Sequence, residues 1–175
     1  MKLDKSSMLL YAVTDRTWLK GRTLADAVEE AIRAGVTFLQ LREKNLDYAS
    51  FLKLAREIKS ITDKYKIPYV INDNVEVAMT SGADGVHVGQ DDMAPRDVRK
   101  IIGPDKILGV SAQTVEQAVL AEESGADYIG VGSVFPTSTK PDAEAVSFET
   151  LKEICKAVSI PVVAIGGINK DNAMK

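Results

Sequence analysis

Short apolar runs alternate with longer amphipathic stretches along the chain. The runs are rich in Val, Ile, Leu and Tyr, and most are continuously apolar rather than alternating between apolar and polar positions. Continuous apolarity is typical of strands that are buried on both faces of a parallel sheet. The pattern predicts seven strands, at residues 9–14, 37–42, 69–72, 85–88, 107–110, 128–131 and 162–165.

The stretches between these strands have the period of amphipathic helices. Leu24, Val28 and Ile32 form one apolar stripe, because residues three and four apart share a face of a helix. Polar residues that can cap a helix N-terminus stand where several of the stretches begin. The expected caps are Thr23, Thr114 and Ser147.

This alternation predicts an α/β fold with a single domain over residues 1–175. We expect a TIM-like (β/α)8 barrel that lacks its eighth strand and helix in this chain. A doubly wound open sheet is the alternative, but no glycine-rich dinucleotide turn follows the first predicted strand. Because seven strands leave two open sheet edges, either the natural chain continues past Lys175 or something else closes the gap.

Composition narrows the class of protein. A net charge of −3 and a pI near 5.3 argue against binding to nucleic acids or to membrane surfaces. The single cysteine, Cys155, excludes an intramolecular disulfide and is expected to be a small core residue of a helix. No segment resembles a signal peptide or a membrane span, so we expect a soluble cytoplasmic protein. Whether it forms a homo-oligomer is left open.

Acidic residues follow two neighbouring predicted strands at their carboxyl ends, where the active sites of parallel barrels lie. Asp73 follows the third strand, and Asp91 and Asp92 follow the fourth. Two carboxylates at this edge suit a hard divalent cation such as Mg²⁺, which also binds the phosphates of a substrate. The local chemistry does not decide between Asp91 and Asp92 as the second ligand.

Cations, hydroxyls and glycines occupy the same end of the predicted barrel. Arg42, Lys44 and Lys140 supply positive charge for phosphate oxygens. The run 137–139 offers three hydroxyl groups, and the pair 166–167 allows the backbone to approach a phosphate closely. Together these residues predict phosphate chemistry assisted by a metal ion.

Several of these residues also have a purely structural interpretation. Asp73 is as well suited to a turn or a helix cap as to a metal site. Glu43 can belong to a surface cluster of ion pairs with its two cationic neighbours, and Asp15 can pair with Arg16. His87 has no nucleophile or metal ligand beside it in the sequence, which favours a hydrogen-bonded strand histidine.

Five segments, in this order, resemble the signature of the thiamine phosphate synthase family. They are QLREK at 40–44, ND at 72–73, GQDD at 89–92, PTSTK at 136–140 and IGGI at 165–168. The resemblance covers essentially the whole chain. It implies a TIM-like barrel, dependence on Mg²⁺ and two small-molecule substrates. These are the diphosphate of 4-amino-5-hydroxymethyl-2-methylpyrimidine and a thiazole phosphate, which give thiamine phosphate and pyrophosphate.

The resemblance also implies roles for individual residues. The magnesium ligands would be Asp73 and Asp92. The catalytic residues would be Arg42, Lys44, Ser111 and Lys140. The substrate-binding residues would be Gln40, Leu41, Arg42, Glu43, Lys44, Asn72, Ser111, Thr137, Ser138, Thr139, Lys140 and Gly167.

The implied reaction is a dissociative transfer, in which pyrophosphate leaves and the thiazole nitrogen attacks a carbocation-like pyrimidine. This mechanism needs electrostatic stabilisation and positioning rather than a covalent nucleophile. The alternatives are a thiazole tautomerase-like or regulatory barrel of related sequence, an inactive truncated form, and an isomerase or aldolase on a phosphate-binding barrel. The acidic residues after two strands favour the synthase, because the first and last alternatives leave them unexplained.

Overall fold

The computed structural model of the chain describes residues 3, 5–137 and 145–174. Each of the seven predicted strands is present. The first is shorter than expected because Leu9 and Leu10 are exposed ahead of it, and the fifth is two residues longer. The strands are β1 (Tyr11–Val13), β2 (Phe38–Leu41), β3 (Tyr69–Asn72), β4 (Gly85–Val88), β5 (Ile107–Ala112), β6 (Tyr128–Val131) and β7 (Val162–Ala164).

One α-helix follows each of the strands β1 to β6, and two short 3-10 helices precede the first α-helix. The helices are η1 (Lys5–Met8), η2 (Arg16–Trp18), α1 (Leu24–Arg33), α2 (Tyr48–Tyr65), α3 (Val75–Ser81), α4 (Pro95–Ile102), α5 (Val115–Glu123) and α6 (Phe148–Ala157). The three predicted caps are confirmed. Thr23, Thr114 and Ser147 accept hydrogen bonds from the backbone N–H groups three residues further on.

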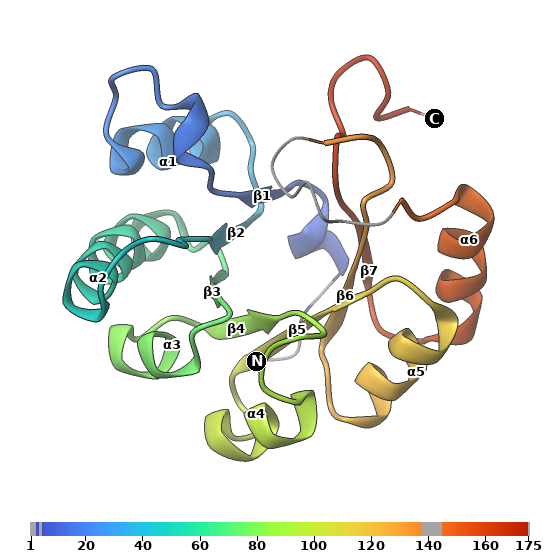
Figure 1. Ribbon diagram of the computed structural model, residues 1–175. Coiled ribbons are helices and arrows are strands. Elements are labelled where there is room, and N and C mark those ends of the chain that lie inside the picture. Colours follow the sequence, from blue (N-terminus) through green and yellow to red (C-terminus); the bar gives the residue numbers. More distant parts are fainter. Residues whose placement is uncertain (1–2, 4, 138–144, 175) are drawn as a thin grey trace.

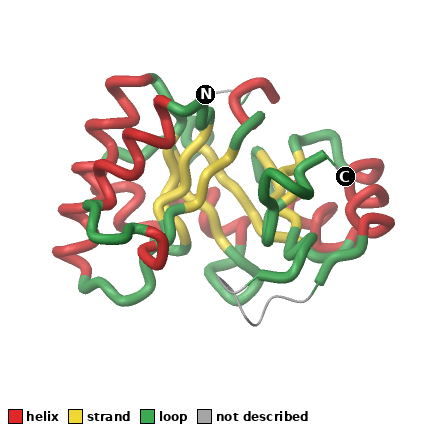
Figure 2. Tube along the Cα trace, turned by 90° about the horizontal axis from the view of Figure 1, so that it is seen from above, coloured by secondary structure: helices red, strands yellow, loops and turns green. Residues whose placement is uncertain are grey.

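All the strand pairs are parallel, and the sheet order follows the chain from β1 to β7. Viewed along the strands, the sheet curls into a nearly closed barrel with the helices on its outside (Figure 1). In the view turned by 90°, the strands lie between two groups of helices (Figure 2). Among the described residues, β1 and β7 are the edges of the sheet, which agrees with the expected TIM-like barrel of seven strands.

Side chains from alternate strand positions form two separate apolar cores. The larger core lies between the sheet and the helices, and Leu41, Val86 and Ile129 are fully buried in it. The smaller core lies inside the barrel and contains Phe38, Val70, Ile107 and Tyr128, with Met8 of η1 packed against it. Successive side chains of a strand point to opposite faces, so β2, β3, β5 and β6 each contribute buried residues to both cores, whereas β4 contributes Val86 and Val88 to the outer core alone.

The prediction for Cys155 is wrong, because its side chain is exposed rather than buried. The buried side of α6 is centred on Ile154, and Val158 follows it one turn later. Successive residues of an α-helix are rotated by about 100°, so Cys155 lies off the buried stripe. Phe148, the first residue of the same helix, is also exposed.

Two glycines inside the barrel make room for large polar side chains. A methyl group at Gly109 of β5 would overlap the ring of Tyr128 and His87 Nδ1. One at Gly130 of β6 would lie 3.1 Å from His87 Cε1. Tyr128 and His87 are both buried, so neither can swing into solvent to relieve the overlap.

We predict that Gly109→Ala lowers the free energy of unfolding by about 1–3 kcal/mol, because overpacking a closed interior forces its neighbours out of place. Gly130→Ala should cost less, since its added methyl group meets a single ring edge. Urea-induced unfolding of both variants and of the unchanged protein measures the difference. Equal stability of Gly109→Ala and the unchanged protein would contradict the tight interior described above.

Candidate active site

The carboxyl ends of β2, β3 and β4 bring three charged side chains together. Lys44, just beyond β2, places its Nζ 2.6 Å from Oδ2 of Asp73, which follows β3 directly. Asp73 has a left-handed backbone with φ of 64° and donates its N–H to the carbonyl of His87 on β4. This bond ties the turn after β3 to the neighbouring strand and holds the Asp73 carboxylate at the mouth of the barrel.

Asp92 joins this cluster from the turn after β4. Its Oδ2 accepts a hydrogen bond of 2.7 Å from the backbone N–H of Gly89, so the turn orients the carboxylate. The pKa of Asp92 is raised, first because the carboxyl group loses contact with water and then because the Asp73 carboxyl lies against it. The structure therefore pairs Asp73 with Asp92. Asp91, the adjacent residue of the same turn, is exposed, as Asp92 is.

Asparagines on either side of Asp73 have different surroundings. Asn72 is a buried residue at the last position of β3, opposite His87 in the register. Asn74 caps α3, because its Oδ1 accepts a bond of 2.8 Å from the N–H of Val77. The structural interpretation of this turn thus applies to Asn74, which leaves the carboxylate of Asp73 directed to Lys44 and Asp92.

Glu43 is held by an ion pair that the sequence did not predict. Its carboxylate accepts bonds of 2.9 Å and 3.0 Å from Nε of Arg16, and its side chain is only 5% exposed. Arg16 thus pairs with Glu43, although Asp15 was suggested as its partner. Asp15 caps η2, because its side chain accepts a hydrogen bond from the N–H of Thr17. The expected ion pairs of Glu43 with Arg42 and Lys44 are replaced by this longer-range pair.

The other residues of the 40–44 segment divide between the two faces of β2. Leu41 is fully buried in the outer core, so its side chain lies away from the barrel interior. The backbone of Arg42 is fixed by Thr14 after β1, whose Oγ1 accepts from the Arg42 N–H at 2.9 Å. Gln40 lies on the inner side, buried, and donates from Nε2 to the hydroxyl of Tyr11 at 2.7 Å.

A chain of hydrogen bonds crosses the barrel interior from Gln40 to Ser111. The hydroxyls of Tyr11 and Tyr128 are 2.7 Å apart, and Tyr128 lies 2.9 Å from His87 Nδ1. His87 Nε2 is 2.9 Å from Ser111 Oγ. His87 is thus the hydrogen-bonded strand histidine that was expected, but one of its partners is a predicted catalytic residue.

The sequence reasoning missed Tyr11 and Tyr128 as members of this site. Burial raises the pKa of both phenols above its usual range, so both hydroxyl groups keep their hydrogens. Their signal was present in the strand alternation, because Tyr11 and Tyr128 open β1 and β6 at inward positions. A buried phenol needs a hydrogen-bond partner, and polar residues on other strands, Gln40 for Tyr11 and His87 for Tyr128, provide it.

The ends of β6 and β7 meet through two glycines. Gly166 and Gly167 have φ values of 95° and 66°, a backbone conformation that favours glycine. A methyl group on Gly167 would overlap the backbone carbonyls of Phe135 and Pro136. The pair therefore packs the turn after β7 against the loop after β6.

The hydroxyl-rich segment predicted after β6 is described only in part. Thr137 is the last described residue of the loop that leaves β6, and it is half-buried. The predicted residues Ser138, Thr139 and Lys140 lie outside the described residues.

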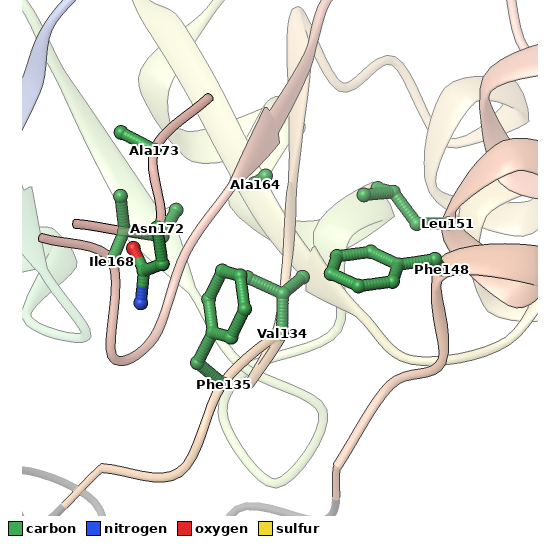
Figure 3. Close-up of a pocket in the computed structure, with 8 residues that line it drawn as sticks. All are labelled: Val134, Phe135, Phe148, Leu151, Ala164, Ile168, Asn172 and Ala173. Atoms are coloured by element: carbon green, nitrogen blue, oxygen red, sulfur yellow. The ribbon is translucent and has the colours of Figure 1, made fainter. Parts of the chain in front are cut away.

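An apolar pocket of about 180 Å³ lies next to these turns (Figure 3). It is bounded by Val134 and Phe135 after β6, by Phe148 and Leu151 of α6, and by the outward-facing Ala164 of β7. The rings of Phe135 and Phe148 pack edge to face, with their centroids 5.6 Å apart. The pocket lies on the α6 side of β7, and the charged cluster at the carboxyl ends of β2 to β4 contributes no side chain to it.

Comparisons with known proteins agree with this geometry. A model of the thiamine monophosphate synthase family matches residues 10–175. The chain belongs to this family. It is 58% identical over 166 residues to the thiamine-phosphate synthase of Clostridium tetani, covering 95% of this chain and 79% of that protein. It is 56% identical over 172 residues to that of Ruminiclostridium cellulolyticum, covering 98% of this chain and 82% of that protein.

A solved structure from the family has the same fold. The thiamine phosphate pyrophosphorylase of Pyrococcus furiosus superposes with a TM-score of 0.88 at 41% sequence identity. The match covers 97% of this chain and 80% of that one. Family membership favours the synthase over an unrelated isomerase or aldolase. As for membranes, none of the helices in the described ranges has the length and apolarity that a transmembrane segment needs.

We predict that Arg16→Ala lowers the free energy of unfolding by about 1–3 kcal/mol, because it leaves the buried Glu43 carboxylate without its cation. Adding Glu43→Gln to that variant should recover part of the loss, since a neutral amide costs less to bury than an unpaired charge. Urea unfolding of the two single variants and the double variant measures this coupling. A further loss in the double variant would contradict the assigned pair.

Proposed function

We propose that the protein is a thiamine-phosphate synthase. It would transfer the 4-amino-2-methylpyrimidin-5-ylmethyl group from its diphosphate to a thiazole phosphate, giving thiamine phosphate and pyrophosphate. The observation that carries the proposal is the convergence of Lys44, Asp73 and Asp92 at the carboxyl ends of β2 to β4. Membership of the family supports the choice of reaction.

The residues at the barrel mouth fit a magnesium ion. Asp73 and Asp92 are two carboxylates in contact, a donor set that Mg²⁺ completes with waters and phosphate oxygens of the substrate. Within the described ranges no third His, Cys, Asp or Glu joins them, which suits a cation that is bound partly by its substrate. Bound there, Mg²⁺ would neutralise diphosphate oxygens and so favour the departure of pyrophosphate.

The side chains around this pair would bind and orient the diphosphate. Lys44 lies at the metal pair and can turn from Asp73 to a phosphate oxygen, because its side chain is about half exposed. The backbone N–H of Arg42 is fixed by its hydrogen bond to Thr14, so the guanidinium group is not needed to hold this residue in place. The guanidinium would bind two phosphate oxygens at once. Ser111, on β5 next to β4, would donate from its hydroxyl group.

Inner and outer residues of the predicted site would have different tasks. Gln40 and Asn72 are buried side chains that would contact the pyrimidine from inside the barrel. Leu41 would contribute through its backbone alone, and Glu43 would hold Arg16 at the rim. These groups position the two reactants and exclude water, so that the thiazole nitrogen rather than water attacks the pyrimidine carbon.

The thiazole phosphate would bind at the ends of β6 and β7. We assign it to Thr137, Ser138, Thr139 and Gly167, and we assign Lys140 to the diphosphate. The support is the close approach of Gly167 to Phe135 and Pro136, which places the turn after β7 beside the loop after β6.

The direct test is to mix the protein with both substrates and measure thiamine phosphate and pyrophosphate, with and without Mg²⁺. We expect both products in equal amounts, and only with Mg²⁺ present. Product formation that is unaffected by a strong chelator would contradict the metal assignment. Folded protein that makes neither product would contradict the proposed activity and favour a regulatory or tautomerase-like barrel.

We predict that Asp92→Asn lowers turnover at limiting Mg²⁺ by about 100-fold, because one of two protein ligands is lost. Asp91→Asn removes the same charge one residue away and should leave the magnesium dependence nearly unchanged. Titrating Mg²⁺ against initial rate for both variants makes the comparison. Equal effects of the two changes would show that charge, rather than coordination by Asp92, governs the dependence.

We expect magnesium binding to weaken as the pH falls. The pKa of Asp92 is raised, so its carboxyl group takes up a proton at a higher pH than an ordinary aspartate does. A protonated carboxyl is a poor ligand, so we predict that apparent magnesium affinity weakens as the pH falls through this raised pKa. Magnesium titrations followed by rate at several pH values measure it. An affinity that is constant down to the pKa of a free aspartate would contradict the pairing.

A further inference from the structure

We infer that Tyr11, Tyr128 and His87 are positioning residues that fix the Ser111 hydroxyl as a hydrogen-bond donor facing the mouth of the barrel. The acceptor would be a phosphoryl oxygen of the diphosphate, an assignment that rests on the proposed function. The direction of the hydrogen bonds follows from Gln40 at the other end of the chain.

The first link sets the direction. Gln40 approaches Tyr11 with Nε2, and an amide nitrogen can only donate. The oxygen of Tyr11 therefore accepts from Gln40. Its own hydrogen also needs an acceptor, which an amide nitrogen cannot be, so we direct it to the hydroxyl oxygen of Tyr128, 2.7 Å away. The raised pKa of each phenol is consistent with two intact hydroxyl groups.

The next links determine which nitrogen of His87 carries the hydrogen. The oxygen of Tyr128 accepts from Tyr11, so its hydrogen goes to the neighbouring Nδ1 of His87 at 2.9 Å. Leaving that buried hydrogen without an acceptor would cost about 1–3 kcal/mol. A neutral imidazole that accepts at Nδ1 carries its hydrogen on Nε2 and donates it to Ser111 Oγ at 2.9 Å.

Ser111 is thereby left with one hydrogen to give away. Its Oγ is occupied as an acceptor by His87, and its backbone carbonyl accepts a bond of 2.6 Å from Nε2 of Gln90. Ser111 lies two residues nearer the carboxyl end of β5 than Gly109, which is level with His87. The hydroxyl hydrogen is therefore available at the mouth, where an anionic oxygen is the complementary partner.

The chain offers a direct test because His87 is its single histidine. A nitrogen NMR spectrum of protein with ¹⁵N-labelled histidine therefore reports this one ring and needs neither substrate nor metal. At mildly alkaline pH we expect the form with hydrogen on Nε2. The form with hydrogen on Nδ1, which the reverse direction of the relay requires, would overturn the inference, and so would a doubly protonated ring.

Variants test whether Gln40 sets the direction. Tyr11→Phe cuts the relay between Gln40 and Tyr128, so the Nδ1-protonated form should appear beside the other. Gln40→Met cuts it from the opposite end and should do the same. The control is Tyr69→Phe, which removes another buried hydroxyl whose partner is the carbonyl of Ala55 in the outer core. A pure Nε2–H form in both Tyr11→Phe and Gln40→Met would overturn the relay.

Activity gives an independent measure. His87→Gln keeps a side-chain N–H that can donate to Ser111, whereas His87→Leu cannot donate. We expect His87→Leu to lower turnover at saturating substrate about tenfold more than His87→Gln, and equal losses would overturn the positioning role. If the protein forms thiamine phosphate but His87 carries its hydrogen on Nδ1, this inference is wrong and the proposed function stands. If His87 carries its hydrogen on Nε2 but no thiamine phosphate forms, the proposed function is wrong and the hydrogen-bond relay stands.

Discussion

The narrow interior of the barrel is the constraint on which the site depends. Gly109 and Gly130 leave the space on β5 and β6 that Tyr128 and His87 occupy, and a methyl group at either position would press on them. Large polar side chains can be buried there only because each hydroxyl and ring nitrogen meets a partner on another strand, which in two of the three bonds across the interior is not the adjacent strand. In this layer, the packing of the side chains and their hydrogen bonds therefore depend on each other.

The interior is graded from apolar to charged along the strands. Phe38 and Ile107 fill the layer towards the amino ends, where Met8 of η1 also packs. The polar layer of Gln40 and His87 lies above it, and the cluster around Asp73 lies at the mouth. Each layer restricts the next, because a buried polar group is well placed only if the groups beneath it cannot move. Charges that would be costly inside the barrel are thus placed where water reaches them.

The sequence predicted the strands well, because their signal is strong and local. Tyr69–Asn72, Gly85–Val88 and Tyr128–Val131 have the expected limits, since continuous apolarity marks strands covered on both faces. The prediction for Cys155 was wrong because neighbouring residues of α6 lie on different sides of the helix, one buried and the next exposed. The apolar pattern of the sequence does not locate the buried side to within one residue. The Glu43–Arg16 pair was missed for another reason. Its partners are 27 residues apart, and adjacency in sequence favoured nearer cations.

The same distinction explains which parts of the site could be foreseen. Asp73 and Asp92 were predictable because strand ends of a parallel sheet share one edge, so position along the chain determines proximity. The local chemistry of the sequence left Asp91 and Asp92 open, and the family resemblance implied Asp92. In the turn after β4, the Gly89 N–H donates to Asp92. For Tyr11 and Tyr128, strand alternation indicates only that the side chains point inward, not which residues they meet. Their role follows from closure of the barrel, which brings β1 and β6 face to face across the interior and joins two hydroxyls that lie 117 residues apart in the chain.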